Sequence, residues 1–308
     1  MEGGGTENHL SKIIPFKHRV SPPNHPVSHA LSTTPPPVLQ IRNLSIERKF
    51  PILRNVNWTV QPGENWVILG ANGSGKTSLL NTLLGYLSET RGSISFGDSA
   101  ADDLEQWDAL RRRIGFVSAS IAQMIEPDEP AEEVVLSGRY AMINYWRPRT
   151  PLAFRQQALT IMRRIACTRL IGQPWETLSQ GERQRILVGR TLMAESLSML
   201  ILDEPCAGLD PVARQHFLDF LQKLLPQKRA GKQQIPSLLL VTHHVEEIIP
   251  IFTHVLILKN GRVLAAGEKR RTLTSANLSD AFNAEIKIRR KGDCYSLAIQ
   301  SETKKVFS

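Results

Sequence analysis

Three short stretches of the chain are apolar almost without interruption. They are WVILG at 66–70, SMLILD at 198–203 and SLLLVTH at 237–243. A run of this length without polar alternation is typical of a strand that is buried on both faces of a sheet. Helix-length segments separate the three runs, so the pattern predicts a largely parallel sheet covered by helices, which is an α/β fold.

Other stretches alternate apolar and polar residues, as strands with one buried face do. VLQIRNLSI begins at Val38, and NVNWTV leads into a Pro62-Gly63 turn. HVLILKNGRVLAAG at 254–267 places Asn260-Gly261 between two such runs, which predicts a closing hairpin. We therefore expect antiparallel strands before the first buried run and a hairpin after the last.

The two ends of the chain differ from its interior. Residues 1–37 contain a triple glycine, proline-rich stretches and little apolar periodicity, so we expect a disordered N-terminal tail. The tail also bears Ser and Thr and few acids, and an organelle transit sequence is the alternative interpretation. Residues 268–308 carry nine Lys or Arg against five Asp or Glu, so we expect a basic C-terminal extension.

Composition restricts the classes of protein that fit. With 308 residues and 41% hydrophobic content, the chain can form one sizeable folded domain with tails. Three cysteines without close spacing indicate neither a disulfide framework nor a zinc site, which favours a reducing compartment. No window approaches the roughly 18 consecutive apolar residues of a membrane span, so we expect any membrane role to come through a partner subunit. The net charge of +9 keeps an anionic partner as an alternative to a solvated basic surface.

A phosphate-binding loop stands directly after the first buried run. GANGSGKTS at 70–78 matches G-x-x-x-x-G-K-[ST] and precedes a helical stretch. Glycines in such a loop let backbone N–H groups wrap phosphates, the lysine reaches the outer phosphates, and the threonine hydroxyl binds Mg²⁺. The expected nucleotide-binding residues are Gly70, Asn72, Gly73, Ser74, Gly75, Lys76, Thr77 and Ser78.

Two adjacent carboxylates end the second buried run. Asp203 lies at the C-terminal end of the predicted strand, where open parallel sheets place their ligands, so it is a candidate to hold Mg²⁺ through water. Glu204 follows it and is placed to orient or deprotonate an attacking water. The two residues and the phosphate-binding loop together predict nucleoside triphosphate hydrolysis.

A second anion site is predicted about a hundred residues after the first. LSQGERQR at 178–185 contains an S-x-x-E capping box formed by Ser179 and Glu182, followed by a helical pattern. A capping box does not require Gly181, whereas a serine hydroxyl and a glycine N–H at an exposed helix N-terminus can bind an anion. The chain thus carries two candidate phosphate-binding helix ends.

The motifs GANGSGKT, LSQGE, LILDEP, AGLD at 207–210 and VTHH at 241–244 stand in this order. Together they closely resemble the ATP-binding cassette (ABC) ATPases over roughly residues 38–267. The resemblance implies a P-loop NTPase fold of ABC type, with a mostly parallel core sheet, an antiparallel β subdomain and a helical subdomain at about 124–177. It also implies ATP and Mg²⁺ as ligands, and a head-to-tail pair of cassettes, either a homodimer or a paired ABC subunit.

The resemblance assigns a role to individual positions. It implies that Lys76, Glu204 and His243 are catalytic, with His243 as the switch histidine that contacts the γ-phosphate, and that Thr77 and Asp203 bind the metal. It implies that Phe50 stacks on adenine. The remaining ATP contacts would come from the signature of the partner chain and from the D-loop aspartate, which here are Ser179, Gln180, Gly181, Glu182 and Asp210.

The chain departs from the family at one position. Ala119 stands where the family usually has a glutamine, and Gln123 follows four residues later. Either Gln123 acts from a shifted loop or the coordination of Mg²⁺ and water is looser. Tyr140, Tyr145 and Trp146 lie in the expected helical subdomain and have two interpretations, a docking surface for a membrane subunit or buried aromatics.

Three functions fit the motifs to different degrees. The first is the ATP-binding and ATP-hydrolysing subunit of an ABC transport complex, located in the cytoplasm, peripheral at the membrane and paired with transmembrane permease subunits. The alternative is a soluble ABC ATPase that acts on the ribosome or nucleic acid, which the single cassette without a heptad run makes less favoured. A regulatory module without turnover is the third, and Glu204 and His243 argue against it.

Overall fold

The computed structural model describes residues 35–97, 99–100, 104–146, 149–224 and 236–299. Almost all of the tail expected at 1–37 lies outside these residues. Pro36–Ser308 forms one compact unit, and the fold below is that of its described part.

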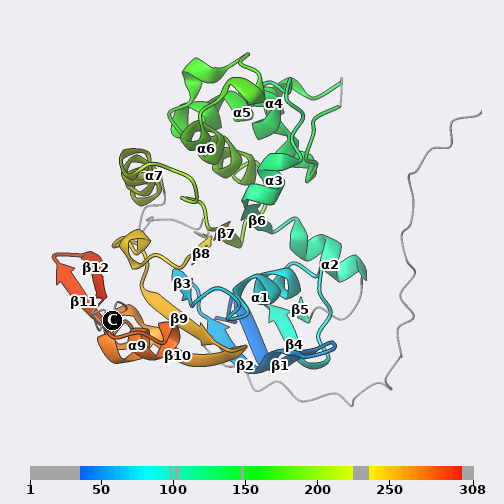
Figure 1. Cartoon of the computed structure of the whole chain (residues 1–308). Helices are drawn as coiled ribbons and strands as arrows, with labels where there is room; N and C mark the ends of the chain where they lie inside the picture. The colour runs from blue at the N-terminus through cyan, green and yellow to red at the C-terminus, as the bar shows by residue number, and fades with distance from the viewer. Residues whose placement is uncertain (1–34, 98, 101–103, 147–148, 225–235, 300–308) are drawn as a thin grey trace, which may run out of the picture. The chain divides into compact units, whose positions relative to one another are not determined.

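The centre of this unit is a six-stranded sheet with the order β10-β9-β3-β8-β7-β6 (Figure 1). Its strands are β3 (Trp66–Leu69), β6 (Ile114–Val117), β7 (Met199–Asp203), β8 (Ser237–Val241), β9 (His254–Lys259) and β10 (Arg262–Glu268). All neighbouring strands are parallel except the β9–β10 pair. The predicted α/β class and the three buried runs are therefore confirmed.

The continuous apolar runs arise because both faces of the central sheet are covered. Val67 and Leu69 belong to one hydrophobic cluster and Ile68 to another, which lies on the opposite face. Leu240 belongs to the first cluster and Leu239 to the second. The side chains of these two leucines and of the three residues of β3 are all at most 1% exposed. Burial of both faces removes the need for polar alternation along the strands.

A smaller antiparallel sheet covers one of these faces and has the order β2-β1-β4-β5. It consists of β1 (Leu39–Glu47), β2 (Pro51–Val60), β4 (Arg91–Phe96) and β5 (Ser99–Ala100), with α1 (Lys76–Leu83) and α2 (Leu104–Arg111) in the same half of the chain. The alternation of β1 shifts between Ile41 and Leu44, where Asn43 has a φ of 50°. This irregularity returns Leu44 and Ile46 to the buried side.

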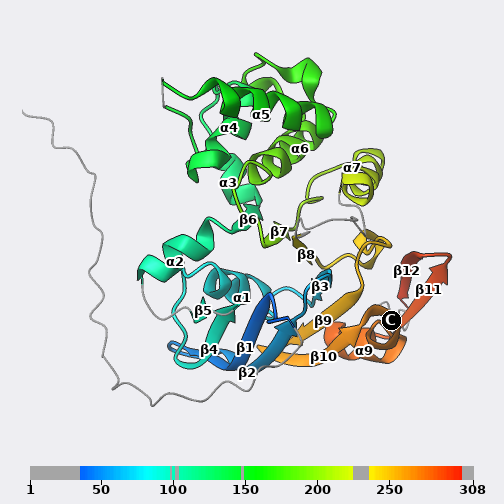
Figure 2. The ribbon, with the colours of Figure 1, turned by 180° about the vertical axis from the view of Figure 1, so that it is seen from behind.

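Helices fill the segment between β6 and β7 (Figures 1 and 2). They are α3 (Ala119–Gln123), α4 (Ala131–Ser137), η1 (Gly138–Tyr140), α5 (Leu152–Arg164), η2 (Thr168–Leu170), η3 (Trp175–Thr177) and α6 (Gln180–Thr191), and α7 (Pro211–Leu224) follows β7. Both views show α4, α5 and α6 grouped together, away from the β2-β1-β4-β5 sheet. Gly138 lets α4 and α6 approach closely, because a Cβ there would lie 1.9 Å from the carbonyl oxygen of Arg190.

The aromatic residues of this helical region do not form one exposed surface. Tyr145 is buried, and its ring packs at 6.3 Å, between centroids, from that of the half-buried Tyr140. Trp146 is 78% exposed. The docking interpretation is therefore wrong for Tyr145, and of these three residues only Trp146 is exposed.

The described C-terminal residues, which end at Ile299, form further strands and helices. The predicted hairpin at 254–267 is confirmed, and its turn residues Asn260 and Gly261 have φ values of 49° and 74°, as a type I′ turn requires. The other elements are η4 (Val245–Glu247), α8 (Lys269–Thr272), α9 (Ser275–Phe282), β11 (Ile286–Lys291) and β12 (Cys294–Ile299). Ile286 and Tyr295 are buried in the main core, so the beginning of the expected basic extension is packed structure.

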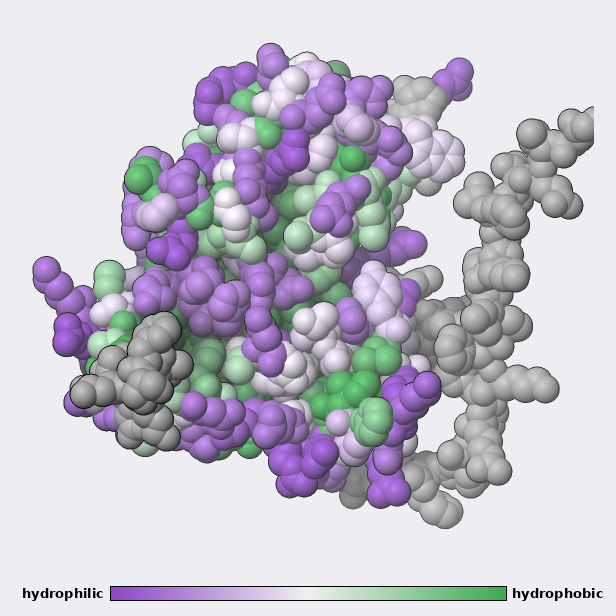
Figure 3. Space-filling model, viewed as in Figure 1, coloured by the Kyte–Doolittle hydropathy of each residue, from purple (hydrophilic) through white to green (hydrophobic). Residues whose placement is uncertain are grey.

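The outer surface of the β11–β12 hairpin is polar. Most exposed residues of the two strands are polar or charged, although Ile299 is 67% exposed, and Figure 3 shows hydrophilic residues beside hydrophobic ones at this edge. Among the described residues, no helix has both the length and the apolar composition that crossing a membrane requires.

Candidate functional site

The carboxyl ends of four parallel strands meet at one edge of the central sheet. Ile68 pairs with Val241, Val241 pairs with Asp203, and Leu202 pairs with Val117. The segments that follow these strands therefore lie side by side at this edge, where open α/β sheets bind their ligands. They are the loop at 70–75, the Asp203-Glu204 pair, His243 and Ser118.

The loop at 70–75 leaves no room for a side chain at two of its glycines. Gly75 caps α1 with a φ of 107°, and a Cβ there would lie 2.7 Å from Cδ2 of Leu53. A Cβ on Gly70 would lie 2.5 Å from the carbonyl oxygen of Leu258 and 2.5 Å from Oγ of Ser74. The loop is thus fixed by contacts within the chain, and it presents the N-terminus of α1.

Lys76 holds the loop from inside. Its Nζ donates hydrogen bonds to the carbonyl oxygens of Gly70 at 2.8 Å and Ala71 at 3.1 Å, and the residue is 7% exposed. Burial lowers the pKa of Lys76, although the carboxylates of Glu204 and Asp203 act in the opposite direction. A buried ammonium held only by neutral carbonyl groups fits a site for an anion, and so does the buried Ser74 Oγ, which has no hydrogen-bond partner in the described part of the chain.

The carboxylate at the end of β7 fits a cation. Burial, followed by the charge of Glu204, raises the pKa of Asp203 to about 6, although Lys76 lowers it. Thr77 is exposed at the start of α1. A hydroxyl and a carboxylate are oxygen ligands of the kind that Mg²⁺ prefers, and a bound cation would compensate the unfavourable charge of the acid pair.

Glu204 is held in an unusual backbone conformation. Its φ is 46°, and its N–H donates to the carbonyl oxygen of Val241 at 2.9 Å. The left-handed region is unfavourable for a glutamate, and residues with such strain are frequent at functional sites. The conformation brings Oε1 of Glu204 to 3.1 Å from Nδ1 of His243, so the two predicted catalytic side chains are in contact.

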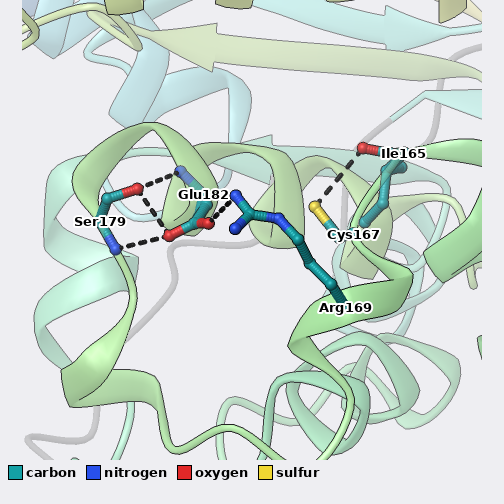
Figure 4. Close-up of polar contacts among 5 residues, drawn as sticks. All are labelled: Ile165, Cys167, Arg169, Ser179 and Glu182. Carbon is teal, nitrogen blue, oxygen red and sulfur yellow. Dashed lines mark hydrogen bonds and ion pairs between the residues drawn. The ribbon is translucent and has the colours of Figure 1, made fainter.

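The predicted capping box at the start of α6 is confirmed (Figure 4). Oε2 of Glu182 accepts hydrogen bonds from the N–H of Ser179 at 2.9 Å and from its hydroxyl at 2.7 Å, and the hydroxyl in turn accepts from the N–H of Glu182 at 3.4 Å. Oε1 of Glu182 pairs with Nη2 of Arg169 at 2.5 Å. Burial raises the pKa of Glu182, but the hydrogen bonds from Ser179 and the charge of Arg169 outweigh it and leave this pKa below its usual value.

Gly181 differs from the glycines of the 70–75 loop. A Cβ at this position would meet nothing within 4 Å, and its φ lies outside the left-handed region. Neither packing nor backbone conformation within the described chain therefore requires a glycine here. The N-terminus of α6 is open at the point where the sequence predicts a second anion site.

The segment after β7 contacts this second site. Nε2 of Gln180 donates to the carbonyl oxygen of Ala207 at 2.6 Å, and Gly208, with a φ of 75°, leaves room for the Gln180 amide. Asp210 caps α7, and its Oδ1 accepts from the N–H groups of Val212 and Ala213. These backbone hydrogen bonds lower the pKa of Asp210.

Phe50 lies outside the central sheet and is 77% exposed. It stands just before Ile52 and Leu53, which contact the phosphate-binding loop at Gly75 and the hairpin turn at Gly261. The strand that begins after Phe50 therefore lies against this loop.

The end of β6 carries no glutamine side chain beside Asp203. Ala119 and Gln123 are both exposed and stand at the two ends of α3. The residue beside Asp203 is instead Ser118, which is buried, accepts from the N–H of Ile121 at 3.3 Å and lies 2.8 Å from the hydroxyl of Ser120. Ser118 was not predicted as a site residue from the sequence. Its only signal there is a serine at the N-cap position of α3.

The fold and this edge of the sheet define a P-loop nucleoside triphosphatase. Comparison with known proteins shows which family within this class the chain resembles. Residues 53–207 match the family model described as ABC transporter. The ABC transporter ATP-binding protein YlmA of Bacillus subtilis is 41% identical over 253 residues, which are 82% of this chain and 93% of that protein. The ABC transporter ATP-binding protein YmeB of Lactococcus lactis is 36% identical over 82% of this chain and 95% of its own length.

Solved structures agree with these relatives. CbiO1 of Clostridium perfringens, part of the ABC transporter complex cbiONQ, superposes with a TM-score of 0.66 at 25% identity and covers 77% of this chain and 90% of its own. A putative metal-chelate type ABC transporter in an inward-facing conformation gives a TM-score of 0.68 at 25% identity, over 87% of this chain and 99% of its own.

The chain therefore belongs to the ABC transporter family, as one of its ATP-binding proteins. It is the ATP-binding and ATP-hydrolysing subunit of a transport complex, and this main interpretation of the sequence is confirmed.

Proposed function

We propose that Lys76, Glu204 and His243 carry out ATP hydrolysis in a site that a second cassette completes. The observation that carries this proposal is the contact between Glu204 and His243 at 3.1 Å, at the same strand ends as the phosphate-binding loop. Lys76 lies close enough for the charges of Glu204 and Asp203 to act on its pKa.

Binding of ATP rests on the loop and the start of α1. The backbone N–H groups at Gly70, Asn72, Gly73, Ser74 and Gly75, together with Ser78, surround the phosphates, and Lys76 exchanges its two carbonyl contacts for phosphate oxygens. Thr77 and Asp203 hold the Mg²⁺, which when bound offsets the charge of the phosphates. Phe50 supplies an exposed ring on which adenine stacks.

Hydrolysis needs a group that accepts a proton from water. Glu204 is the base, because its carboxylate stands at the strand end with one oxygen on His243 and no lysine or arginine paired with it among the described residues. His243 orients this carboxylate and places its other ring nitrogen for the γ-phosphate. The strained φ of Glu204 keeps the two side chains together before ATP binds.

The second cassette contributes the signature. Ser179, Gly181 and the N-terminus of α6 of one chain cover the ATP that is bound by the other, and Gln180, Glu182 and Asp210 hold this surface in place. The open space over Gly181 supports this arrangement, because the glycine is not required by its own chain. The active unit is a homodimer or a pair with another ABC subunit.

The permease contacts the helical subdomain at about 124–177. The exposed ring of Trp146 supports this surface, since large exposed aromatic side chains are enriched at protein interfaces. We infer an ABC ATPase domain at 38–267 that works inside the cell at the membrane surface, with a tail at 1–37 and a basic extension from 268 onward.

One observation favours the nucleic-acid alternative. Lys287, Arg289 and Lys291 alternate along β11, all are exposed, and the described residues offer them no ion pair, while Ile286 and Ile288 face the core. A row of cations can follow a phosphate backbone. ATPase activity that single-stranded RNA stimulates in wild type, and no longer stimulates after Lys287→Glu and Arg289→Glu, would favour this function over transport.

The test is ATP hydrolysis by the purified chain at increasing protein concentration. We expect a turnover number that rises with concentration, because two chains build each site. Glu204→Gln should reduce turnover about 10²- to 10⁴-fold, the range found for removal of a general base, while it retains ATP and accumulates as a dimer in light scattering. Turnover that is independent of concentration, or a Glu204→Gln variant with full activity, would contradict the proposal.

A further inference from the structure

The start of α6 contains a chain of contacts that extends beyond the signature (Figure 4). Oε2 of Glu182 accepts two hydrogen bonds from Ser179, at 2.9 Å from its N–H and at 2.7 Å from its hydroxyl. Oε1 of the same carboxylate pairs with Nη2 of Arg169. The two carboxylate oxygens therefore have different partners, the helix cap on one side and an arginine on the other.

This carboxylate is unfavourable for the ligand that the proposed function assigns to the same helix end. A negative charge next to Ser179 repels a triphosphate, and it also engages the serine hydroxyl as a donor. The N-terminus of α6 and Gly181 attract the same triphosphate. A cation that pairs with Glu182 shifts this balance toward binding.

Arg169 is the cation in direct contact with Glu182. It belongs to the short η2 turn, its side chain is 78% exposed, and that of Glu182 is 21% exposed. Arg185 also acts on Glu182 through its charge, but its guanidinium lies over the ring of Phe220, 5.3 Å from the centroid. The helix cap itself uses only atoms of Ser179 and Glu182.

We propose that Arg169 is a positioning residue for the signature serine. By pairing with Oε1 of Glu182, it offsets the carboxylate charge and weakens the hold of Oε2 on the Ser179 hydroxyl, which then turns to the γ-phosphate of the ATP in the partner chain. The inference rests on the proposed composite site. It identifies a residue, outside the signature motif, that sets how tightly two cassettes close over ATP.

The experiment measures ATP-dependent dimerisation in the Glu204→Gln background, with Arg169→Ala added. Each of the two sites in a symmetric dimer loses one arginine, so a weakening of about threefold at each site raises the dissociation constant of the dimer about tenfold. Binding of a fluorescent ATP analogue to the monomer should stay unchanged, because Arg169 contacts Glu182 at the start of α6, and the chain's own phosphate-binding loop precedes α1. The matched control is Arg163→Ala, which removes another exposed arginine, one that donates a hydrogen bond to the Thr160 hydroxyl.

A double variant separates this role from a structural one. Glutamine keeps the capping box but removes the charge, so Glu182→Gln should restore dimerisation in the Arg169→Ala background to within about twofold of Glu182→Gln alone. A merely structural arginine would weaken dimerisation equally in both backgrounds and would lower the melting temperature in each.

The possible results have distinct meanings. If the chain with Glu204→Gln alone forms no dimer in ATP, the composite site is wrong and the role of Arg169 falls with it. If that dimer forms and Arg169→Ala leaves its dissociation constant unchanged, only the role of Arg169 is wrong. A tenfold loss that Glu182→Gln does not restore also overturns this role, because Arg169 would then act through another group.

Discussion

The two helix ends that the chain offers to phosphate are built in different ways. At α1, glycine is required by the chain itself, since Gly75 has a φ of 107° and no room for a Cβ, and a buried lysine supplies the charge. At α6, glycine meets open space, and the serine hydroxyl is engaged by a carboxylate of its own helix. The glycine at the first end is required by contacts within its own chain, whereas no contact within the described chain requires the glycine at the second end.

Gly75→Ala is expected to have the largest effect on stability. Alanine at this φ costs about 1–2 kcal/mol, and the overlap with Leu53 adds about 1–3 kcal/mol. The free energy of unfolding should therefore fall by about 2–5 kcal/mol in chemical denaturation, and ATP binding should be lost with the shape of the loop. A variant that unfolds at the wild-type denaturant concentration would show that the loop is not fixed by its own chain.

The acids at the two ends also differ, in the direction of their pKa shifts. Asp203 has a pKa raised to about 6, so its ionised form destabilises the fold in the absence of ligand. Glu182 has a lowered pKa, so its ionised form stabilises the fold. A bound cation would therefore stabilise ionised Asp203, whereas ionised Glu182 is already stabilised by contacts within its own chain.

Asp203→Asn should stabilise the nucleotide-free protein at pH 7.5. The raised pKa of the folded state corresponds to about 1–2 kcal/mol after a discount for solvent screening. The advantage should shrink as the pH falls through about 6 and vanish below 3.8, the ordinary pKa of an aspartate, where the carboxyl is protonated in both the folded and the unfolded states.

Urea denaturation at several pH values measures this dependence. Glu182→Gln provides the opposite case and should lower stability at neutral pH, with a difference that disappears as the pH falls through the depressed pKa of the folded state. If the free energies of unfolding of the two variants changed with pH in the same direction relative to wild type, the opposite pKa shifts of Asp203 and Glu182 would be wrong.

Most of the fold and the residues of the first site could be predicted from the sequence. The buried runs of β3, β7 and β8 and the Asn-Gly turn carry local signals, and the phosphate-binding loop lies within nine consecutive residues. The sequence predicts that Lys76, Asp203 and His243 lie close together. Each stands at or shortly after the end of a predicted strand, and parallel strands bring their carboxyl ends together.

The contacts of the second site could not be predicted in the same way. Arg169 pairs with Glu182 across 13 residues, and Gln180 reaches Ala207 across 27, and neither contact leaves a periodic pattern. Burial of Tyr145 depends on its packing against Tyr140 and the main core, which follows from tertiary structure. The β11–β12 hairpin was not predicted either. Its buried residues Ile286 and Tyr295 stand in a strongly charged segment, so the apolar pattern of the two strands is weak.

Ser179→Ala tests whether the serine at the second site has more than a capping role. Loss of an N-cap costs about 1 kcal/mol, so the free energy of unfolding should fall by that amount. Dimerisation in ATP should fall much more than the cap accounts for, since in the proposed composite site the hydroxyl also binds the γ-phosphate. Ser179→Asp keeps an N-cap but adds a negative charge, so it should restore stability without restoring the dimer.

Gly181→Ala has the smallest expected effect on the monomer and separates the two ends most clearly. Glycine at a helical position is less favourable than alanine, and open space surrounds this one, so the substitution should stabilise the monomer by about 0.5 kcal/mol. The same methyl group would stand where the triphosphate of the partner chain approaches, and we expect ATP-dependent dimerisation and turnover to be lost. A monomer that is more stable but unable to dimerise shows that glycine is present for an external ligand. A variant that dimerises normally would mean that no ligand comes within contact of Gly181, and the composite site would then have to be abandoned.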